Sequence, residues 1–198
     1  MKSKKILVLL TFITISLWNI GASQAMEPDI FVQSTVNRAS DALNNKFSKE
    51  EKIKKLKTIA KETVDIDGIG NYTLGAYRKS LTKNQEKEYK LLFEQYFLKS
   101  FSSRLAEYSN PEIEVNSKKK LNESYTMVSS VLIATDRRPE VKIDWRIYTK
   151  DTNNPLIRDL IIEGLSLART QKEEFSSIIE SNDGNIQVLF DNLKEFSK

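Results

Sequence analysis

The 198-residue chain contains no histidine and no cysteine, which excludes a Ser-His-Asp triad, a Cys-His pair, the common zinc sites and any disulfide bond. It has 31 basic and 27 acidic residues, but three of the lysines lie among the first five residues. Without those three, 28 basic residues face 27 acidic ones. The overall charge therefore gives no support to nucleic-acid binding, which needs a clustered basic face.

The N-terminus has the pattern of a cleaved secretory signal. Three lysines precede an almost wholly apolar run over residues 6–20, and Ser23 and Ala25 are the small residues expected before a cut after Ala25. The apolar run is shorter than the roughly 20 residues needed to span a bilayer. We therefore predict export from a bacterial cytoplasm, a signal peptide over residues 1–25, and a single soluble domain over residues 26–198.

Residues 28–78 predict a group of helices with one interruption. Residues 28–47 form a weakly patterned first helix, and Ser48 begins a second one, because Glu51 three residues later completes a capping box. Two glycines predict a break over residues 67–71, since glycine is unfavourable inside a helix. A further short helix is expected over residues 72–78.

The longest predicted helix begins at Thr82, where Gln85 completes a second capping box, and it ends before Pro111. Large apolar residues recur along it at steps of three and four and form one broad stripe. An ordinary core explains this stripe at least as well as a ligand cavity does. Its members are Tyr89, Leu92, Phe93, Tyr96, Phe97, Phe101, Leu105 and Tyr108.

The second half of the chain predicts a sheet followed by two helices. Strands are expected over residues 112–117, 125–135, 141–148 and 156–167, and short links between them favour an antiparallel meander. Helices follow over residues 168–180 and 185–196. This order predicts an α+β fold with one curved sheet of about four strands and helices on one face.

Acidic residues offer the only candidates for catalysis. Asp65 and Asp67 stand beside Tyr72, and Asp159 and Glu163 share one strand face, so either set could be drawn as a proton-transfer site. Nothing in their spacing requires this. Solvated or turn-forming acids are the favoured interpretation, and we expect no enzyme, no metal site and no cofactor.

Three stretches together resemble the MlaC family, the periplasmic phospholipid-binding proteins also grouped under toluene tolerance and described as auxiliary components of an ABC transporter. They are Asn-Tyr-Thr-Leu-Gly-Ala-Tyr-Arg at 71–78 with the helix start at 81–85, Val-Lys-Ile-Asp-Trp-Arg at 141–146, and Asp-Leu-Ile-Ile-Glu-Gly-Leu-Ser at 159–166. The resemblance spans roughly residues 67–193. It departs at Leu165, where Val or Ile is usual, and over residues 118–122, which match nothing in the pattern.

This resemblance implies a fold akin to nuclear transport factor 2, with an apolar cavity between helices and sheet and a phospholipid as cargo. It implies a periplasmic carrier that shuttles lipid between an outer-membrane lipoprotein–porin complex and an inner-membrane ABC transporter with a lipid-binding substrate subunit, and so maintains outer-membrane lipid asymmetry. An enzyme on the same scaffold and a ligand-free interaction module remain the alternatives.

On this basis we expect ten apolar residues to line the cavity, with plain core packing an equal alternative for each. They are Ile69, Leu74, Phe93, Phe97, Phe101, Val131, Ile133, Ile143, Trp145 and Ile161. Tyr72 and Arg78 are placed at the mouth, where a guanidinium could meet a phosphate. An ordinary surface ion pair is the favoured role for Arg78.

Overall fold

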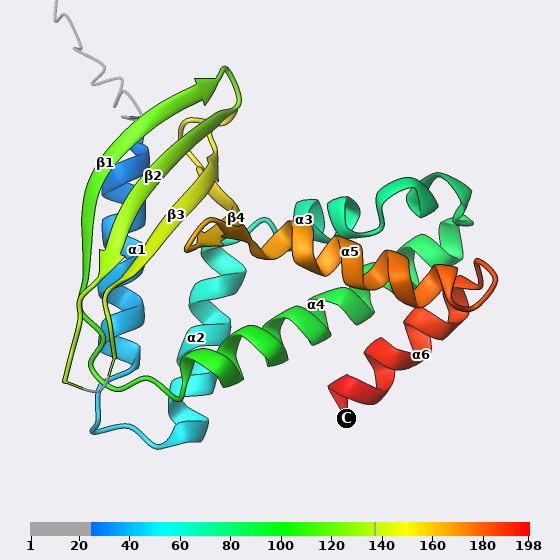
Figure 1. The fold of residues 1–198 in the computed structure, drawn as a ribbon, viewed down its shortest axis with the longest axis horizontal. Helices are drawn as coiled ribbons and strands as arrows, with labels where there is room; N and C mark the ends of the chain where they lie inside the picture. The colour runs from blue at the N-terminus through cyan, green and yellow to red at the C-terminus, as the bar shows by residue number, and fades with distance from the viewer. Residues whose placement is uncertain (1–24, 137) are drawn as a thin grey trace, which may run out of the picture.

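The computed structural model describes residues 25–136 and 138–198. The predicted signal peptide lies outside these residues except for Ala25, so cleavage after Ala25 stays a prediction. The described chain combines α-helices with one antiparallel sheet, which confirms the predicted α+β class. Figure 1 shows the sheet curving beside α1 at one side of the molecule, while α3, α5 and α6 extend to the other side.

The sheet is a meander of five strands in the order β1-β2-β3-β4-β5. The strands are β1 (Ile113–Asn122), β2 (Tyr125–Leu132), β3 (Val141–Tyr148), β4 (Leu156–Ile162) and β5 (Leu165–Ser166). The strand predicted over residues 156–167 is divided, because Glu163 and Gly164 adopt positive φ angles of 49° and 82° and turn the chain back. β1 is longer than predicted, since residues 118–120 also pair with β2.

Both capping boxes predicted from the sequence are present. Ser48 accepts a hydrogen bond from the Glu51 N–H and begins α2 (Lys49–Thr63), which follows α1 (Pro28–Ala42). Thr82 does the same with Gln85 and begins α4 (Lys83–Leu105). At the start of each helix, two backbone N–H groups that lack a partner within the helix are bonded by the side chains of the capping box. Because this chemistry is local, the sequence predicts where both helices begin.

The break predicted over residues 67–71 is wrong. α3 (Ile66–Thr73) runs through both glycines, and a 3₁₀ helix, η1 (Gly75–Ser80), follows it. The Asp65 side chain accepts from the Gly68 N–H at 2.8 Å and so caps α3. A Cβ on Gly70 would lie only 2.8 Å from a ring carbon of Phe93. The glycine at position 70 thus permits close helix packing rather than interrupting the helix.

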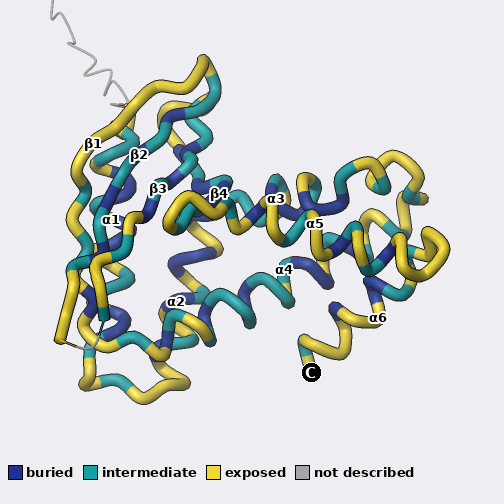
Figure 2. The backbone as a smooth tube through the Cα atoms, viewed as in Figure 1, coloured by how far each residue is buried: buried dark blue, intermediate teal, exposed yellow. Residues whose placement is uncertain are grey.

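The remaining helices, α5 (Leu167–Glu180) and α6 (Ile186–Ser197), complete the packing. α1 packs against β1 and β2, α3 and α5 pack against β4, and α4 packs against α2, α3 and α6. The largest cluster of buried apolar side chains draws on the sheet and on helices from both ends of the chain, and Figure 2 shows buried segments along both. None of the described helices is both long enough and apolar enough to cross a membrane.

Candidate functional site

A row of aromatic rings lies along one face of α4. Tyr89, Phe93, Phe97 and Phe101 are four residues apart, so their side chains share a face of the helix. Successive ring centroids are 5.7, 6.1 and 5.6 Å apart. Tyr89 and Phe93 are buried, whereas Phe97 and Phe101 are half-buried. The row is therefore less tightly enclosed toward the C-terminal end of α4.

The inner face of the sheet presents a second apolar surface. Val128 is paired with Trp145, and Ile143 and Ile147 flank Trp145 on the same face of β3. The Trp145 indole N–H donates to the Ser130 hydroxyl at 2.8 Å, and that hydroxyl donates to the Ile143 carbonyl. These bonds satisfy the polar atoms, so what this face offers to a ligand is hydrocarbon.

The structure brings seven of the ten predicted lining residues together. Five are buried members of one cluster and the other two, Phe97 and Phe101, are half-buried and pack against it. The five buried members are Ile69, Leu74, Phe93, Ile143 and Trp145. Because these side chains pack on one another, an acyl chain held among them would require the half-buried ones to move apart.

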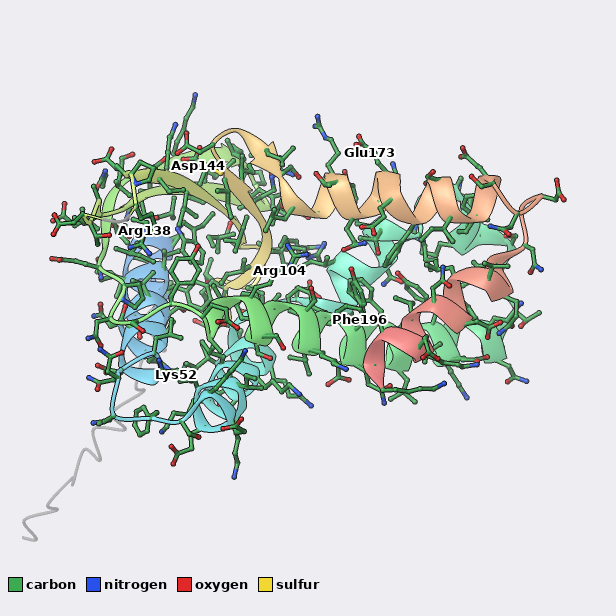
Figure 3. The ribbon with its side chains drawn as sticks, turned by 60° about the horizontal axis from the view of Figure 1, so that its bottom comes forward. Lys52, Arg104, Arg138, Asp144, Glu173 and Phe196 are labelled. Carbon is green, nitrogen blue, oxygen red and sulfur yellow. The ribbon has the colours of Figure 1, made fainter. Side chains whose placement is uncertain are left out.

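The other three predicted lining residues do not join this cluster. Val131 pairs with Lys142, and Ile161 pairs with Asp144, which lies on the side of the sheet away from α1 in Figure 3. Strand alternation therefore places both on the outer face. Ile133 follows the end of β2 and lies outside the buried cluster. Their apolar character alone gave no indication of the face on which each would lie.

The two residues predicted at the mouth are separated. Tyr72 is 44 % exposed, carries the Lys172 ammonium 5.4 Å from its ring centroid, and lines two pockets. Arg78 is exposed on η1 and belongs to the lining of neither pocket. Arg169 lines the first of these pockets with Tyr72, and the second is lined by Tyr72 together with Arg146 and Arg158.

These two arginines line a pocket of about 340 Å³ between α3, the β1–β2 hairpin, β3 and β4. A β-bulge in β4 shifts the register between the Arg146–Asp159 and Ile147–Ile157 pairs. Both Arg158 and Asp159 consequently face outward beside Arg146, while Ile157 and Leu160 face the core. The sequence shows no signal for this bulge, so it does not predict that the two arginines are neighbours.

A larger pocket of about 550 Å³ lies where Tyr72 meets the outer side of α5. It is lined mainly by charged and hydroxyl side chains, among them Arg169, Lys172, Glu173 and Glu180. Figure 3 shows Glu173 on the outer side of α5. Most of the surface that this pocket exposes is polar, so it suits an acyl chain poorly.

The acidic residues considered for proton transfer are engaged elsewhere. Asp65 caps α3 and pairs with Arg158, while Asp67 lies near Lys90. Asp159 accepts from the Ser166 hydroxyl and the Ala168 N–H, whereas Glu163 accepts from the Lys142 N–H. Each of these four carboxylates therefore already has a hydrogen-bond or ion-pair partner within the fold.

Burial raises the pKa of two tyrosines on α4. Tyr89 is fully buried and hydrogen-bonds Thr73, and Tyr96 donates to the Gln171 side chain. A raised pKa keeps both phenols protonated, so neither is prepared to act as a base at neutral pH. Within residues 25–136 and 138–198, no cluster of acidic side chains could hold a metal ion.

Comparison with known proteins identifies similarities both in sequence family and in fold. A sequence model described as the MlaC protein matches residues 33–195. A solved structure of a phospholipid-binding protein from Ralstonia solanacearum, in complex with a phospholipid, superposes with a TM-score of 0.73 at 17 % identity, over 87 % of this chain and 97 % of that chain. No curated protein matches the sequence.

Proposed function

The chain belongs to the MlaC family, and from this premise we propose that it binds a phospholipid and carries it through the periplasm. The observation that carries the proposal is that the aromatic row on α4 and the apolar inner face of the sheet belong to one cluster of apolar side chains. Seven side chains expected to contact lipid gather there, and two of them are only half-buried. The similarity in fold to a protein solved with a phospholipid supports the same reading.

The physical requirement on such a carrier is to keep hydrocarbon away from water. Each methylene transferred to water is unfavourable by about 0.8 kcal/mol, so an acyl chain of roughly 15 methylenes needs about 12 kcal/mol of shielding. Phe97 and Phe101 can supply part of this shielding, because their rings already stack at 5.6 Å with one face against the core. No catalytic group is needed for that task.

Phospholipid extraction tests the proposal directly. The mature protein, purified from the periplasm of an expressing cell and extracted with organic solvent, should yield about one phospholipid per chain by mass spectrometry. Protein that folds and yields no phospholipid after incubation with phosphatidylethanolamine vesicles contradicts the proposal.

A photoreactive phenylalanine analogue locates the lipid. Placed at Phe97 or Phe101, it should cross-link to phospholipid on irradiation. Placed at Leu91, which is 57 % exposed on the same helix, it should not. Equal cross-linking at all three positions would indicate adventitious lipid rather than a site between α4 and the sheet.

We further propose which partners donate the lipid to this protein and accept it. We expect exchange with an outer-membrane lipoprotein–porin complex and with the lipid-binding substrate subunit of an inner-membrane ABC transporter, in support of outer-membrane lipid asymmetry. Transfer of labelled phospholipid from loaded protein to that purified subunit should exceed transfer to protein-free vesicles. The enzyme alternative gains no support from the acids, which cap helices or pair with cations.

A further inference from the structure

The geometry points to a phosphate-binding site formed by Arg146 and Arg158 in the 340 Å³ pocket on the outer side of β3 and β4. The ligand is a phosphate group, either the phosphodiester of a phospholipid headgroup or free phosphate. Binding of a phospholipid headgroup rests on the proposed carrier function, whereas binding of free phosphate does not.

Arg158 is held in place before any ligand arrives. Its Nε–H donates to Asp65 at 2.5 Å and its Nη1 to the Tyr125 hydroxyl at 3.1 Å. Its guanidinium carbon lies 4.3 Å from the ring centroid of Tyr148. Gly68 keeps this position open, since a Cβ there would lie 2.6 Å from the Arg158 Nε. A guanidinium fixed in this way loses little entropy when its remaining N–H groups bind an anion.

Arg146 provides the second guanidinium with most of its donors still available. It pairs with Asp159 at 3.7 Å, beyond ordinary hydrogen-bond length, and its side chain is 39 % exposed. Arginine presents five N–H donors in a fork that matches phosphate oxygens. Two such groups beside one pocket can therefore contact two oxygens of the same phosphate.

The two nearby carboxylates do not cancel this capacity, because each is bound by the first turn of a helix. Asp65 accepts the Gly68 N–H of α3, and Asp159 accepts the Ala168 N–H of α5 at 3.0 Å and the Ser166 hydroxyl at 2.6 Å. The partial positive charge of a helix N-terminus offsets a carboxylate placed there. The N–H groups of Arg146 and Arg158 that do not bond these carboxylates are therefore available to bind an anion.

Apart from the Asn122 amide and two tyrosine hydroxyls, the rest of the lining is apolar, which favours a phosphate that carries hydrocarbon. Ile69 and Ala168 are buried members of the core cluster, so the floor of the pocket is the edge of the core. Leu121 and Tyr72 stand at the pocket with 43 % and 44 % of their surfaces exposed. A phosphodiester between the arginines would place its glycerol and chains beside Ile69, at the edge of the surface formed by α4 and the sheet.

The test compares two lipids that differ only in the headgroup, because diacylglycerol lacks the phosphate and the ethanolamine of phosphatidylethanolamine. Binding of phosphatidylethanolamine and of diacylglycerol with the same acyl chains is measured for the mature protein and for Arg146→Gln. Because Arg146 recognises the phosphate, the variant should bind phosphatidylethanolamine about tenfold more weakly, the effect of losing one hydrogen bond to a charged group. Diacylglycerol binding should be unchanged. Arg38→Gln, which removes an arginine that lines neither pocket and pairs with Glu62, should alter neither.

A parallel titration with inorganic phosphate, followed by ³¹P NMR, separates the two sources. Saturable phosphate binding that Arg146→Gln abolishes, with both lipids unaffected, assigns the site to free phosphate and stands even if extraction yields no phospholipid. If Arg146→Gln leaves phosphate and both lipids unaffected, or weakens both lipids equally, the inference is overturned. If Arg146→Gln does not fold, Arg146→Lys, which keeps the charge but not the fork, should weaken phosphatidylethanolamine binding alone.

Discussion

Gly70 lies where the ring of Phe93 leaves no room for a side chain. Alanine in a helix interior is normally more stable than glycine by about 0.5–1 kcal/mol. At position 70 we expect the opposite, because the added Cβ would lie 2.8 Å from the Phe93 Cδ1 and force two buried helices apart. Gly70→Ala should lower the free energy of unfolding by about 1–3 kcal/mol in urea denaturation.

A double-mutant cycle separates this clash from any general effect of the substitution. In a Phe93→Leu background the ring is absent, so Gly70→Ala should be much less destabilising than in the wild type. Additive effects of the two changes would show that the packing of Phe93 on α3 is not the reason for the glycine.

The sequence predicts the sheet face of some strand residues but not of others. Trp145 and Ile143 could be assigned to the core from strict alternation along β3, because each neighbour in the sequence is polar. Val131 and Ile161 stand in strands that carry apolar residues on both faces, so alternation does not predict which face either residue occupies. Their cross-strand partners Lys142 and Asp144 place both on the outer face.

At the scale of elements, the ends of α2 and α4 could be predicted because capping is local chemistry. The course of α3 could not, since Gly68 and Gly70 are explained by Arg158 and Phe93, which lie 90 and 23 residues away in the sequence. The bulge in β4 is likewise a matter of register between strands. The arginine pair depends on that register and therefore had no sequence signal.

Thr82 tests the contribution of a local cap. It accepts from the Gln85 N–H at 3.3 Å, and the Gln85 side chain accepts from the Thr82 N–H at 3.0 Å. Thr82→Ala should lower the free energy of unfolding by about 1 kcal/mol, as for other N-cap substitutions. Ser80→Ala, just before the cap, removes an exposed hydroxyl that donates to the Tyr77 carbonyl. It should lower the free energy of unfolding by less than Thr82→Ala does, when both variants are compared by thermal melts. An equal effect at both positions would contradict the role of the cap.

The contact between β1 and the start of α1 should depend on pH. The Lys118 ammonium bonds Glu27 and lies 2.8 Å from Asp29, and this hydrogen bond holds the pKa of Asp29 below its usual value. A carboxyl with a lowered folded-state pKa contributes stability above its unfolded value of 3.8, and the contribution is lost as pH falls below that value.

Acid titration of Asp29→Asn checks this expectation. The wild-type protein should lose slightly more stability than the variant between about pH 5 and pH 2, because only the wild type must protonate a paired carboxylate on unfolding. Both carboxylate and ammonium are partly exposed, so the difference is small and should shrink in high salt. Identical pH profiles would show that the pair does not link α1 to β1 in solution.

At the scale of the whole molecule, burial varies along the surface proposed for lipid. Phe93 and Trp145 are buried, while Phe97 and Phe101 are half-buried toward the C-terminal end of α4. Local opening is easiest where few apolar contacts must be broken. We therefore expect lipid to enter beside these two half-buried rings, between the C-terminal half of α4 and the inner face of the sheet, with the part of α4 around Tyr89 and Phe93 remaining fixed against α3 and α6.

Hydrogen exchange on lipid-loaded and lipid-stripped protein tests this division. A ligand that binds the folded state alone raises its stability by RT ln(1 + [L]/Kd), about 2.7 kcal/mol at one hundred times Kd. Loading should therefore slow exchange over the whole core, but most strongly at residues 97–105 and in β3 and β4, where the stripped protein opens locally. Protection should change least around Tyr89 and Phe93, where α4 stays packed against α3 and α6. Uniform protection along α4 would mean that the lipid enters a rigid molecule elsewhere, and the half-buried rings of Phe97 and Phe101 would then not mark its route.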